Sequence, residues 1–441
     1  MPPPVTALGV SPPPQTTRNL LAYAVPELFW GMTWALAIDG PMVAAYRDAF
    51  GGGETFVGLA WFVGSFAIGF LGLFSALWVE PMKHKRGFVF WGHVAGGVAL
   101  LIGAALIKSW AASSAMAACA AYLIGIGAFF LTVGILLPGW LALVGELFVG
   151  GMQSRVLGIT FVCNKIAAVI GGQFVARTIL DNTWTATDQW SFLFLLAGSV
   201  AVVGSIPFLW IVETPRPRPE RKALRAYFAS LRDALRELPG LRRFIVADVL
   251  GISLMLVLAY AADAAIQRAG LPRADAGHWV AMGAAGMLGM SGLVAWRARH
   301  VHPRTWFLLG TTAGVLAALA AAYGSTDLAA SWGGAHLAFD IAAFGNGMYL
   351  GVRASCHAPL VMRLSPGRDG TAPIGVAVAC IMLMQGGAPM VGAHVIAHHG
   401  YLPLFLAVAA CGTISFVLLV LRVPIDVLTR EHGNRVAELQ E

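Results

Sequence analysis

The stretch ETPRPRPERKALRAYFASLRDALRELPGLRR, residues 213–243, is the only long charged segment of an otherwise apolar chain. The sequences on its two sides resemble each other, because several residues recur 217 or 218 positions later. The matched pairs are Gly134 and Gly351, Leu147 and Leu364, Gly158 and Gly375, Cys163 and Cys380, Arg86 and Arg304, and Gly92 and Gly310. We therefore predict two similar halves, residues 20–212 and 244–423, joined by a basic loop.

The composition places the chain in a lipid bilayer. Of its 441 residues, 58% are hydrophobic and only 12% are charged, whereas soluble domains carry about 25% charged residues. Apolar segments of about 20 residues recur, each long enough to cross about 30 Å of hydrocarbon. We expect an all-α integral membrane protein, since a β-barrel would show short alternating segments. The twelve predicted spans are 22–46, 55–79, 87–107, 114–138, 156–178, 189–212, 244–264, 276–296, 304–324, 332–352, 372–395 and 401–422.

The basic residues predict the orientation of the spans. If both termini are cytoplasmic, 23 of the 29 Lys and Arg residues lie on the cytoplasmic side and five lie outside. This bias follows the positive-inside rule, and we expect the inner membrane of a bacterial-type cell. The tails, residues 1–19 and 424–441, would be cytoplasmic, and the first is expected to be disordered. The pI of about 9.4 reflects the same bias and gives no support to nucleic-acid binding.

The basic loop has helical periodicity. Leu224, Phe228, Leu231 and Leu235 share one face of residues 220–238, and the arginines fall largely off that face. We expect an amphipathic helix on the anionic cytoplasmic surface of the membrane. The five cysteines lie in spans or near the cytoplasmic side, and none has the spacing of a metal site, so we expect no disulfide.

Two loop segments carry a family resemblance. In residues 76–86, ALWVEPMKHKR, an acidic residue precedes a basic cluster, and in residues 145–155, GELFVGGMQSR, a glutamate precedes an arginine. With twelve spans in two halves, this pattern resembles the major facilitator superfamily. The family's glycines are missing from the first segment, so the motif is degenerate and no subfamily is identified. The residues concerned are Glu80, Lys83, Lys85, Arg86, Glu146 and Arg155.

The resemblance implies a twelve-helix fold that gives alternating access to a site between the halves. It also implies that these loop charges form a gate that latches the cytoplasmic side of the two halves. Plain positive-inside charge is an equally good explanation of the basic cluster.

Lys165 is the sharpest functional candidate. It lies ten residues after Arg155 and twelve before Arg177, which places it near the bilayer midplane, where an ionisable group is by default functional. It could meet an anionic substrate, or it could pair with Asp39 of the first span. The sequence Asp39-Gly40-Pro41 indicates either a broken helix at a binding site or a simple proline kink.

Further polar and aromatic residues could complete the site. Glu27 and Asp248, near the cytoplasmic ends of their spans, are candidate proton carriers. The alternative is that each pairs with an interfacial arginine; for Asp248, the neighbours are Arg242 and Arg243. Trp34, Asn346 and Gln385 are candidate substrate contacts, with helix packing as the alternative for each.

Two histidine pairs suggest metal chemistry. His336 and Asp340 are four residues apart, as are His394 and His398, so each pair shares a helix face. Imidazole and carboxylate groups at this spacing can bind a divalent transition metal. His93 and His278 have no recognisable partners and are expected to be packed polar residues.

The leading functional hypothesis is a secondary active transporter of a small solute, with an anion among the candidates and protons as the coupling ion. It would work as a monomer, without a cofactor. One alternative is transport or handling of a transition metal such as iron; another is a non-transporting assembly factor or sensor. No glycine loop with Lys-Ser/Thr is present to bind ATP phosphates, and no nucleophile motif indicates an enzyme. Substrate identity, direction, and symport or antiport stay open.

Overall fold

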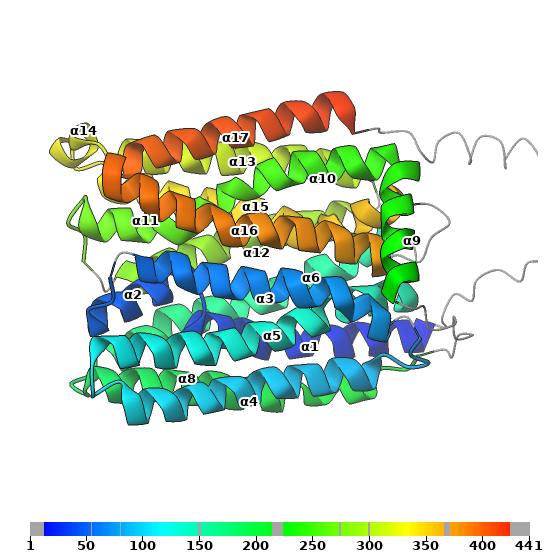
Figure 1. Cartoon of the computed structure of the whole chain (residues 1–441), viewed down its shortest axis with the longest axis horizontal. Helices are drawn as coiled ribbons and strands as arrows, with labels where there is room; N and C mark the ends of the chain where they lie inside the picture. Colours follow the sequence, from blue (N-terminus) through cyan, green and yellow to red (C-terminus); the bar gives the residue numbers. More distant parts are fainter. Residues whose placement is uncertain are drawn as a thin grey trace, which may run out of the picture.

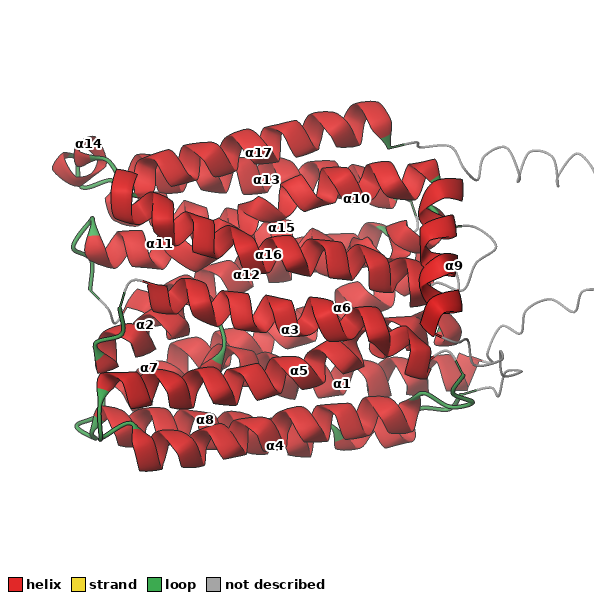
Figure 2. Cartoon of the chain, in the orientation of Figure 1, coloured by secondary structure: helices red, strands yellow, loops and turns green. Residues whose placement is uncertain are grey.

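The computed structural model describes residues 13–53, 55–79, 81–148, 151–213, 224–272, 275–298, 300–365 and 371–423. In these ranges every regular element is a helix (Figure 2). Most helices run side by side along the long axis of the molecule (Figure 1). The end at which the described chain begins and finishes, on the right in Figure 1, is called the α9 end here, and the opposite end the α14 end.

The helices fall into two groups separated by α9 (Leu224–Glu237). The N-terminal half comprises α1 (Pro13–Ala37), α2 (Gly40–Phe50), α3 (Thr55–Val79), α4 (Arg86–Trp110), α5 (Ala115–Leu147), α6 (Gly151–Ile170), the π-helical turn η1 (Gly171–Ala176), α7 (Arg177–Leu180), α8 (Ala186–Gly204) and the short 3-10 helix η2 (Ile206–Trp210). The C-terminal half comprises α10 (Pro239–Gly251), the 3-10 turn η3 (Ile252–Leu254), α11 (Met255–Gln267), α12 (Ala276–Arg297), α13 (Pro303–Gly324), α14 (Asp327–Ser331), α15 (Ala335–Arg363), α16 (Thr371–His399) and α17 (Tyr401–Arg422).

The twelve-span fold is confirmed. Eleven stretches of described helix are long and apolar enough to cross a membrane. The 29-residue helix α15 packs against α12 and α13 and makes the twelfth span. Several predicted spans were too short. In particular, α5 continues past position 138 to Leu147 and α15 continues past position 352 to Arg363. Both helices run through a proline, which helices buried among other spans tolerate. The first helix begins at Pro13, so residues 13–19 of the tail expected to be disordered are helical.

The first span is broken at Asp39-Gly40-Pro41, as one of the two sequence interpretations predicted. Asp39 is the N-cap of α2, with φ −57° and ψ 146°, and Pro41 occupies the first turn. The Asp39 side chain makes no capping hydrogen bond. The corresponding span of the second half is interrupted too, by η3 between α10 and α11. Irregular backbone within a membrane is typical of the binding sites of transporters.

The repeated glycines have the same structural role in both halves. A Cβ atom on Gly134 of α5 would lie 2.6 Å from the carbonyl oxygen of Ala67 in α3. A Cβ atom on Gly351 of α15 would lie 2.8 Å from the carbonyl oxygen of Met287 in α12. A larger residue would force these backbones apart. Each glycine therefore lets the fourth span of its half pack directly on the second.

Two other repeated glycines lie where the halves meet. A Cβ atom on Gly158 of α6 would lie 2.9 Å from the carbonyl oxygen of Ser291 in α12, and one on Gly375 of α16 would lie 3.6 Å from that of Gly72 in α3. Thus α6 packs on α12, and α3 packs on α16. The interface between the halves has the same pseudo-symmetry as the sequence.

At the α9 end, each repeated arginine joins the third span of its half to the end of the sixth. Arg86, at the start of the third span, donates a hydrogen bond from its guanidinium to the carbonyl oxygen of Ile211 at 3.0 Å, after the sixth span. Arg304, at the start of the ninth span, donates to the carbonyl oxygens of Leu419, at 2.9 Å, and Val420, near the end of the twelfth. These bonds satisfy helix-terminal carbonyl groups that would otherwise lack partners.

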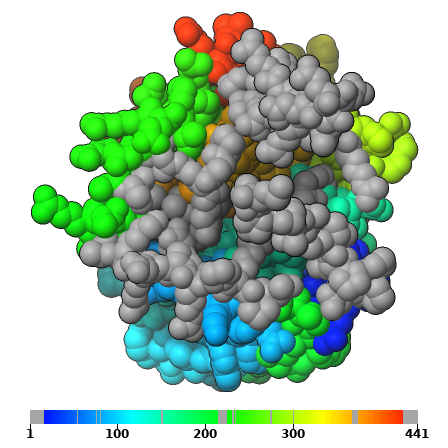
Figure 3. All heavy atoms as spheres, turned by 90° about the vertical axis from the view of Figure 1, so that its right-hand side faces the viewer, coloured from blue at the N-terminus to red at the C-terminus, as the bar shows by residue number. Residues whose placement is uncertain are grey.

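The segment predicted as an amphipathic helix contains α9, which lies across the ends of the spans (Figure 1); the predicted positions 220–223 lie outside the described residues. Tyr227 is fully buried, donates a hydrogen bond to the carbonyl oxygen of Leu73 at 2.8 Å, and thereby ties α9 to α3. Figure 3 looks onto this end, with the N-terminal half in blue and cyan below and the last helices in orange and red above.

The glycines of α12 provide a test of the packing argument. A Cβ atom on Gly286 would lie 2.0 Å from the carbonyl oxygen of Phe344 in α15, whereas one on Gly289 would meet nothing within 4 Å. We expect Gly286→Ala to destabilise the protein by about 1–3 kcal/mol through overpacking. Gly289→Ala, the matched control on the same helix, should be neutral or stabilising. Thermal unfolding of the purified proteins compares them, and equal melting temperatures would contradict the argument.

Candidate functional site

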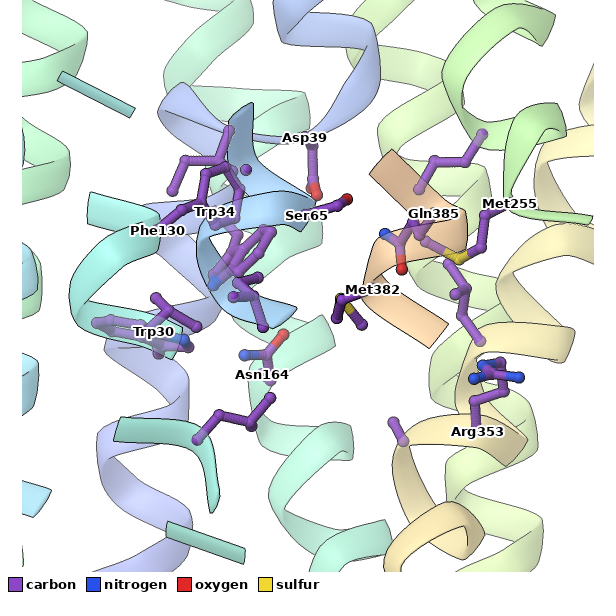
Figure 4. A pocket seen from close by; sticks show the side chains of 18 of the residues that line it. Trp30, Trp34, Asp39, Ser65, Phe130, Asn164, Met255, Arg353, Met382 and Gln385 are labelled. Carbon is purple, nitrogen blue, oxygen red and sulfur yellow. The ribbon is translucent and has the colours of Figure 1, made fainter. Parts of the chain in front are cut away.

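A cavity of about 350 Å³ lies between the two halves and is lined by both. In Figure 4, Trp30, Trp34 and Phe130 form one side, and Met255, Gln385 and Arg353 lie opposite them. Asp39 and Asn164 also reach the cavity, from different levels of the N-terminal half. Of the predicted substrate contacts, Trp34 therefore lies in the wall from the N-terminal half and Gln385 in the wall from the C-terminal half.

The wall from the N-terminal half is aromatic. The Trp30 ring stacks on Phe129, with ring centroids 5.2 Å apart, and meets His93 edge-on at 4.6 Å. Trp34 makes edge contacts with Phe129 and Phe130. His93 is buried and bonded to the Val89 carbonyl oxygen at 2.8 Å. These contacts hold the tryptophan rings in place against the cavity.

Three charged residues of the N-terminal half line the cavity: Glu27, Asp39 and Lys165. Glu27 is buried and accepts a hydrogen bond from the Asn164 side chain at 2.9 Å. The helices bearing these two residues touch, because a Cβ atom on Gly31 would lie 1.8 Å from the carbonyl oxygen of Asn164. The pair Glu27–Asn164 is thus built into the contact of α1 with α6.

Lys165 and Asp39 face the same space but are not bonded to each other. Both line the main cavity and an adjoining cavity of about 60 Å³. Among the described residues, no ion pair or hydrogen bond engages the Lys165 ammonium, although it is close enough to act electrostatically on both Glu27 and Asp39. Asp39 and Lys165, which were predicted to pair, therefore line the same cavity without contacting each other directly.

The wall from the C-terminal half contains a buried ion-pair cluster. Arg353 of α15 lines the cavity and binds both carboxylate oxygens of Asp248 in α10, one of them at 3.2 Å. His357, one turn further on, places Nε2 3.2 Å from Asp248. Arg353 also donates to the Tyr349 hydroxyl at 3.1 Å. All four side chains are buried or nearly so.

The partners of Asp248 correct the sequence prediction, which named Arg242 and Arg243. The predicted tenth span stopped at position 352, so Arg353 was counted as a loop residue and missed. Because α15 continues to Arg363, Arg353 lies within the membrane bundle. The spacing of Arg353 and His357, one helical turn apart, was the available signal.

Asn346 lines the smaller cavity rather than the larger one. Its amide nitrogen donates to the Leu254 carbonyl oxygen at 2.8 Å, within the break of the seventh span. Its buried amide oxygen has no hydrogen-bond partner among the described residues. Asn346 thus supports η3 and leaves one acceptor available next to the site.

The loop charges named by the family resemblance act within one half. Lys85 forms an ion pair with Glu146, and the backbone N–H groups of Lys85 and Arg86 donate to the Glu213 carboxylate. These contacts join α4, α5 and the segment that follows η2, so they do not latch the two halves together. Lys83 and Arg155 are exposed, and Glu80 lies outside the described residues.

The halves are instead joined by an ion pair near the α14 end. Arg47 of α2 and Asp263 of α11 are both buried and lie 2.8 Å apart. The Tyr401 hydroxyl donates to the second oxygen of Asp263 at 2.8 Å. The sequence prediction treated Arg47 as an outer-loop charge and did not find this contact, because its partner is 216 residues away.

The predicted pair His336 and Asp340 is in contact, and His278 joins it. His278 of α12 and His336 of α15 both lie 3.1 Å from oxygens of Asp340, so His278 has partners that the sequence did not reveal. These three groups place one ligand atom each within 4.8 Å of one another. His394 and His398 contact each other, with ring centroids 4.2 Å apart, and do not belong to this group.

Twelve spans in two pseudo-symmetric halves, with a polar site in a cavity between them, define a secondary transporter architecture. The family model of the Major Facilitator Superfamily matches residues 28–357, so the chain belongs to that superfamily. No curated protein sequence matches the chain significantly.

Solved structures of low sequence identity share the fold. The human organic anion transporter MFSD10 is 16% identical, with a TM-score of 0.65 over 92% of this chain and 99% of its own. The E. coli fucose:proton symporter is 13% identical, with a TM-score of 0.63 and coverages of 92% and 99%. A D-xylose–proton symporter is 13% identical, with a TM-score of 0.68 and coverages of 93% and 98%.

The Asp248–Arg353 pair predicts a stability effect. Arg353→Met leaves the Asp248 carboxylate buried without its main partner, which we expect to cost about 3–5 kcal/mol. The double variant Asp248→Leu/Arg353→Met removes both charges and should recover much of that loss. Thermal unfolding of the three proteins tests this. A double variant less stable than the single variant would contradict the assignment.

Proposed function

We propose that the protein is a proton-coupled secondary transporter of small organic anions that have an apolar body. The observation that carries the proposal is Lys165, a cavity-lining ammonium without an ion-pair partner among the described residues. A charge within the membrane bundle is costly unless it is compensated. When the cavity carboxylates Glu27 and Asp39 are protonated, an anion that enters the cavity supplies the compensating negative charge.

The remaining wall supports an apolar body. Trp30, Trp34 and Phe130 offer flat aromatic surface, and Met255 and Met382 offer adaptable apolar surface opposite them. A cavity of about 350 Å³ is near the lower end of the range for small-molecule sites, about 300–1,000 Å³. The solute is therefore small.

Hydrogen-bond donors in the wall also favour an anion. Trp61 and Trp140 line the cavity, and the indole N–H of each is buried with no acceptor among the described residues. An indole nitrogen only donates, so either group would donate to an oxyanion once a rotation of its ring turns the N–H toward the cavity. Arg353 contributes positive charge from the opposite wall, although Asp248 already engages it.

Glu27 and Asp39 are the proposed proton carriers. When both are ionised, they oppose the charge of Lys165 and an entering anion is repelled. When they are protonated, Lys165 dominates the cavity and the anion is attracted. Proton and anion therefore occupy the cavity together, which is symport. This coupling requires that the two carboxylates and the Lys165 ammonium line one cavity and interact electrostatically.

The orientation and the resembling structures fit the same scheme. We place the α9 end in the cytoplasm, at an inner membrane, because the basic residues concentrate there. The named relatives of similar fold include an organic anion transporter and proton symporters of sugars. At their low identity these structures show a shared fold alone, and the choice of an anion depends on Lys165.

Binding of matched ligands tests the anion assignment. We expect benzoate to bind to the purified protein more tightly than benzamide or benzylamine, which have the same ring but a neutral or positive group. Lys165→Met should weaken benzoate binding by about ten- to a hundredfold, through loss of a charged hydrogen bond. Lys108→Met, at an exposed site paired with Asp188, is the control. Calorimetry measures the affinity of each protein for each ligand. Equal affinity of the native protein for benzamide and benzoate would refute the proposal that the substrate is an anion.

Flux measurements test the proton carriers. In proteoliposomes, an inward proton gradient should drive uptake of the bound anion by the native protein. Asp39→Asn or Glu27→Gln should abolish this acceleration and leave anion exchange at equal pH intact, because only the coupling is removed. Asp188→Asn, outside the cavity, should behave as the native protein does. Full gradient-driven uptake by both cavity variants would exclude these two carboxylates as carriers.

A further inference from the structure

The N-terminal ends of α12 and α15 bring together four potential metal ligands. Asp275 precedes the first turn of α12 and His278 follows in that turn, whereas His336 and Asp340 lie in the first two turns of α15. This metal-ligand cluster lies at the α14 end, entirely within the C-terminal half. The four residues approach one another only through the packing of α12 on α15.

One carboxylate lies at the centre of the cluster. Oδ1 of Asp340 is 3.1 Å from Nε2 of His278, and Oδ2 is 3.1 Å from Nδ1 of His336. The other ring nitrogen of His336, Nε2, lies 3.6 Å from Asp275. One ligand atom from each of His278, His336 and Asp340 falls within a 4.8 Å group. Small side-chain rotations would bring these atoms to ordinary metal-ligand distances of about 2.0–2.2 Å.

We propose that this cluster binds a divalent transition-metal ion. Two imidazoles with one or two carboxylates are the ligands preferred by zinc, cobalt and nickel, whereas calcium and magnesium prefer oxygen ligands alone. The side chains are partly exposed, between 18% and 44%, so an ion can reach them from solvent. The i, i+4 spacing of His336 and Asp340 presents both on one face of α15.

The bound ion is a clamp and not transported cargo. All four ligands belong to one half, and none lines either of the two cavities that Lys165 lines. Their chain neighbours Trp279 and Phe339 do line the smaller cavity, so the cluster lies immediately behind that wall. An ion there holds α12 to α15 and leaves the central passage free.

The clamp is next to a contact between the halves. A Cβ atom on Gly277, which precedes His278, would lie 3.2 Å from the carbonyl oxygen of Gly172 in η1 of the N-terminal half. Fixing His278 therefore also steadies the part of α12 on which the N-terminal half rests. Metal binding is expected to raise the melting temperature of the folded protein, because the unfolded chain lacks the site.

Calorimetric titration of the purified protein, prepared without a polyhistidine tag, tests the proposal. We expect one Zn²⁺ or Ni²⁺ ion per chain and no saturable Ca²⁺ binding. His278→Ala and His336→Gln should each weaken binding by at least about tenfold. The double variant His394→Ala/His398→Ala, which removes a histidine pair of the same spacing on α16, is the matched control and should bind normally.

Cobalt absorption provides a second measurement that does not depend on one variant. Co²⁺ bound by nitrogen and oxygen ligands should give visible bands in the native protein and in the α16 control, and not in His336→Gln, whose fold is checked by thermal unfolding. Absence of saturable binding would overturn the proposal. Binding that survives in His278→Ala and His336→Gln, or is lost in the α16 control, would overturn it equally. Each result is independent of whether an anion is transported.

Discussion

Direct contact between helix backbones is the constraint on which the rest of this structure depends. Lipid is as apolar as the helix surfaces, so burial of leucine or valine does little to hold spans together, and close packing has to replace it. Gly134 and Gly351 permit that packing inside the halves, and Gly158 permits it between them. Gly31 permits the contact of α1 with α6 that sets Glu27 beside Asn164. These backbone contacts fix the positions of the helices that form the cavity walls.

The two halves share a frame but differ in the groups that face the cavity. Position 165 is a lysine in the first half, and the matching position 382 is a methionine; both line the cavity. In the N-terminal wall, Lys165 is free of direct partners among the described residues, whereas the C-terminal wall locks Arg353 to Asp248. One wall therefore keeps its charge available for a ligand, and the other uses its charge to hold α10 against α15.

Alternating access requires the halves to separate at one end at a time. At the α14 end, the buried pair of Arg47 and Asp263 joins α2 to α11, both of which belong to interrupted spans. In the proposed transport cycle, opening that end would separate this pair and expose both charges to water, which lowers the cost of breaking it. At the α9 end, Lys85 pairs with Glu146 of α5 and Arg86 with the carbonyl oxygen of Ile211, so both charges are used within the N-terminal half.

The sequence by itself determined the twelve spans, the two halves and the helical periodicity of α9, because hydropathy, charge and backbone chemistry are local properties. It left a break and a proline kink as alternatives at Asp39, and the structure shows the break. It also marked Lys165 as a candidate, because a lone ammonium in an apolar run has few explanations; Lys165 lines the cavity, and its role stays a prediction. Only the tertiary structure decided the partners. Arg353 with Asp248, Arg47 with Asp263, and His278 with Asp340 join residues 105, 216 and 62 positions apart. Periodicity gives the face on which a residue lies along its own helix, whereas such pairs depend on which helices become neighbours and at what height.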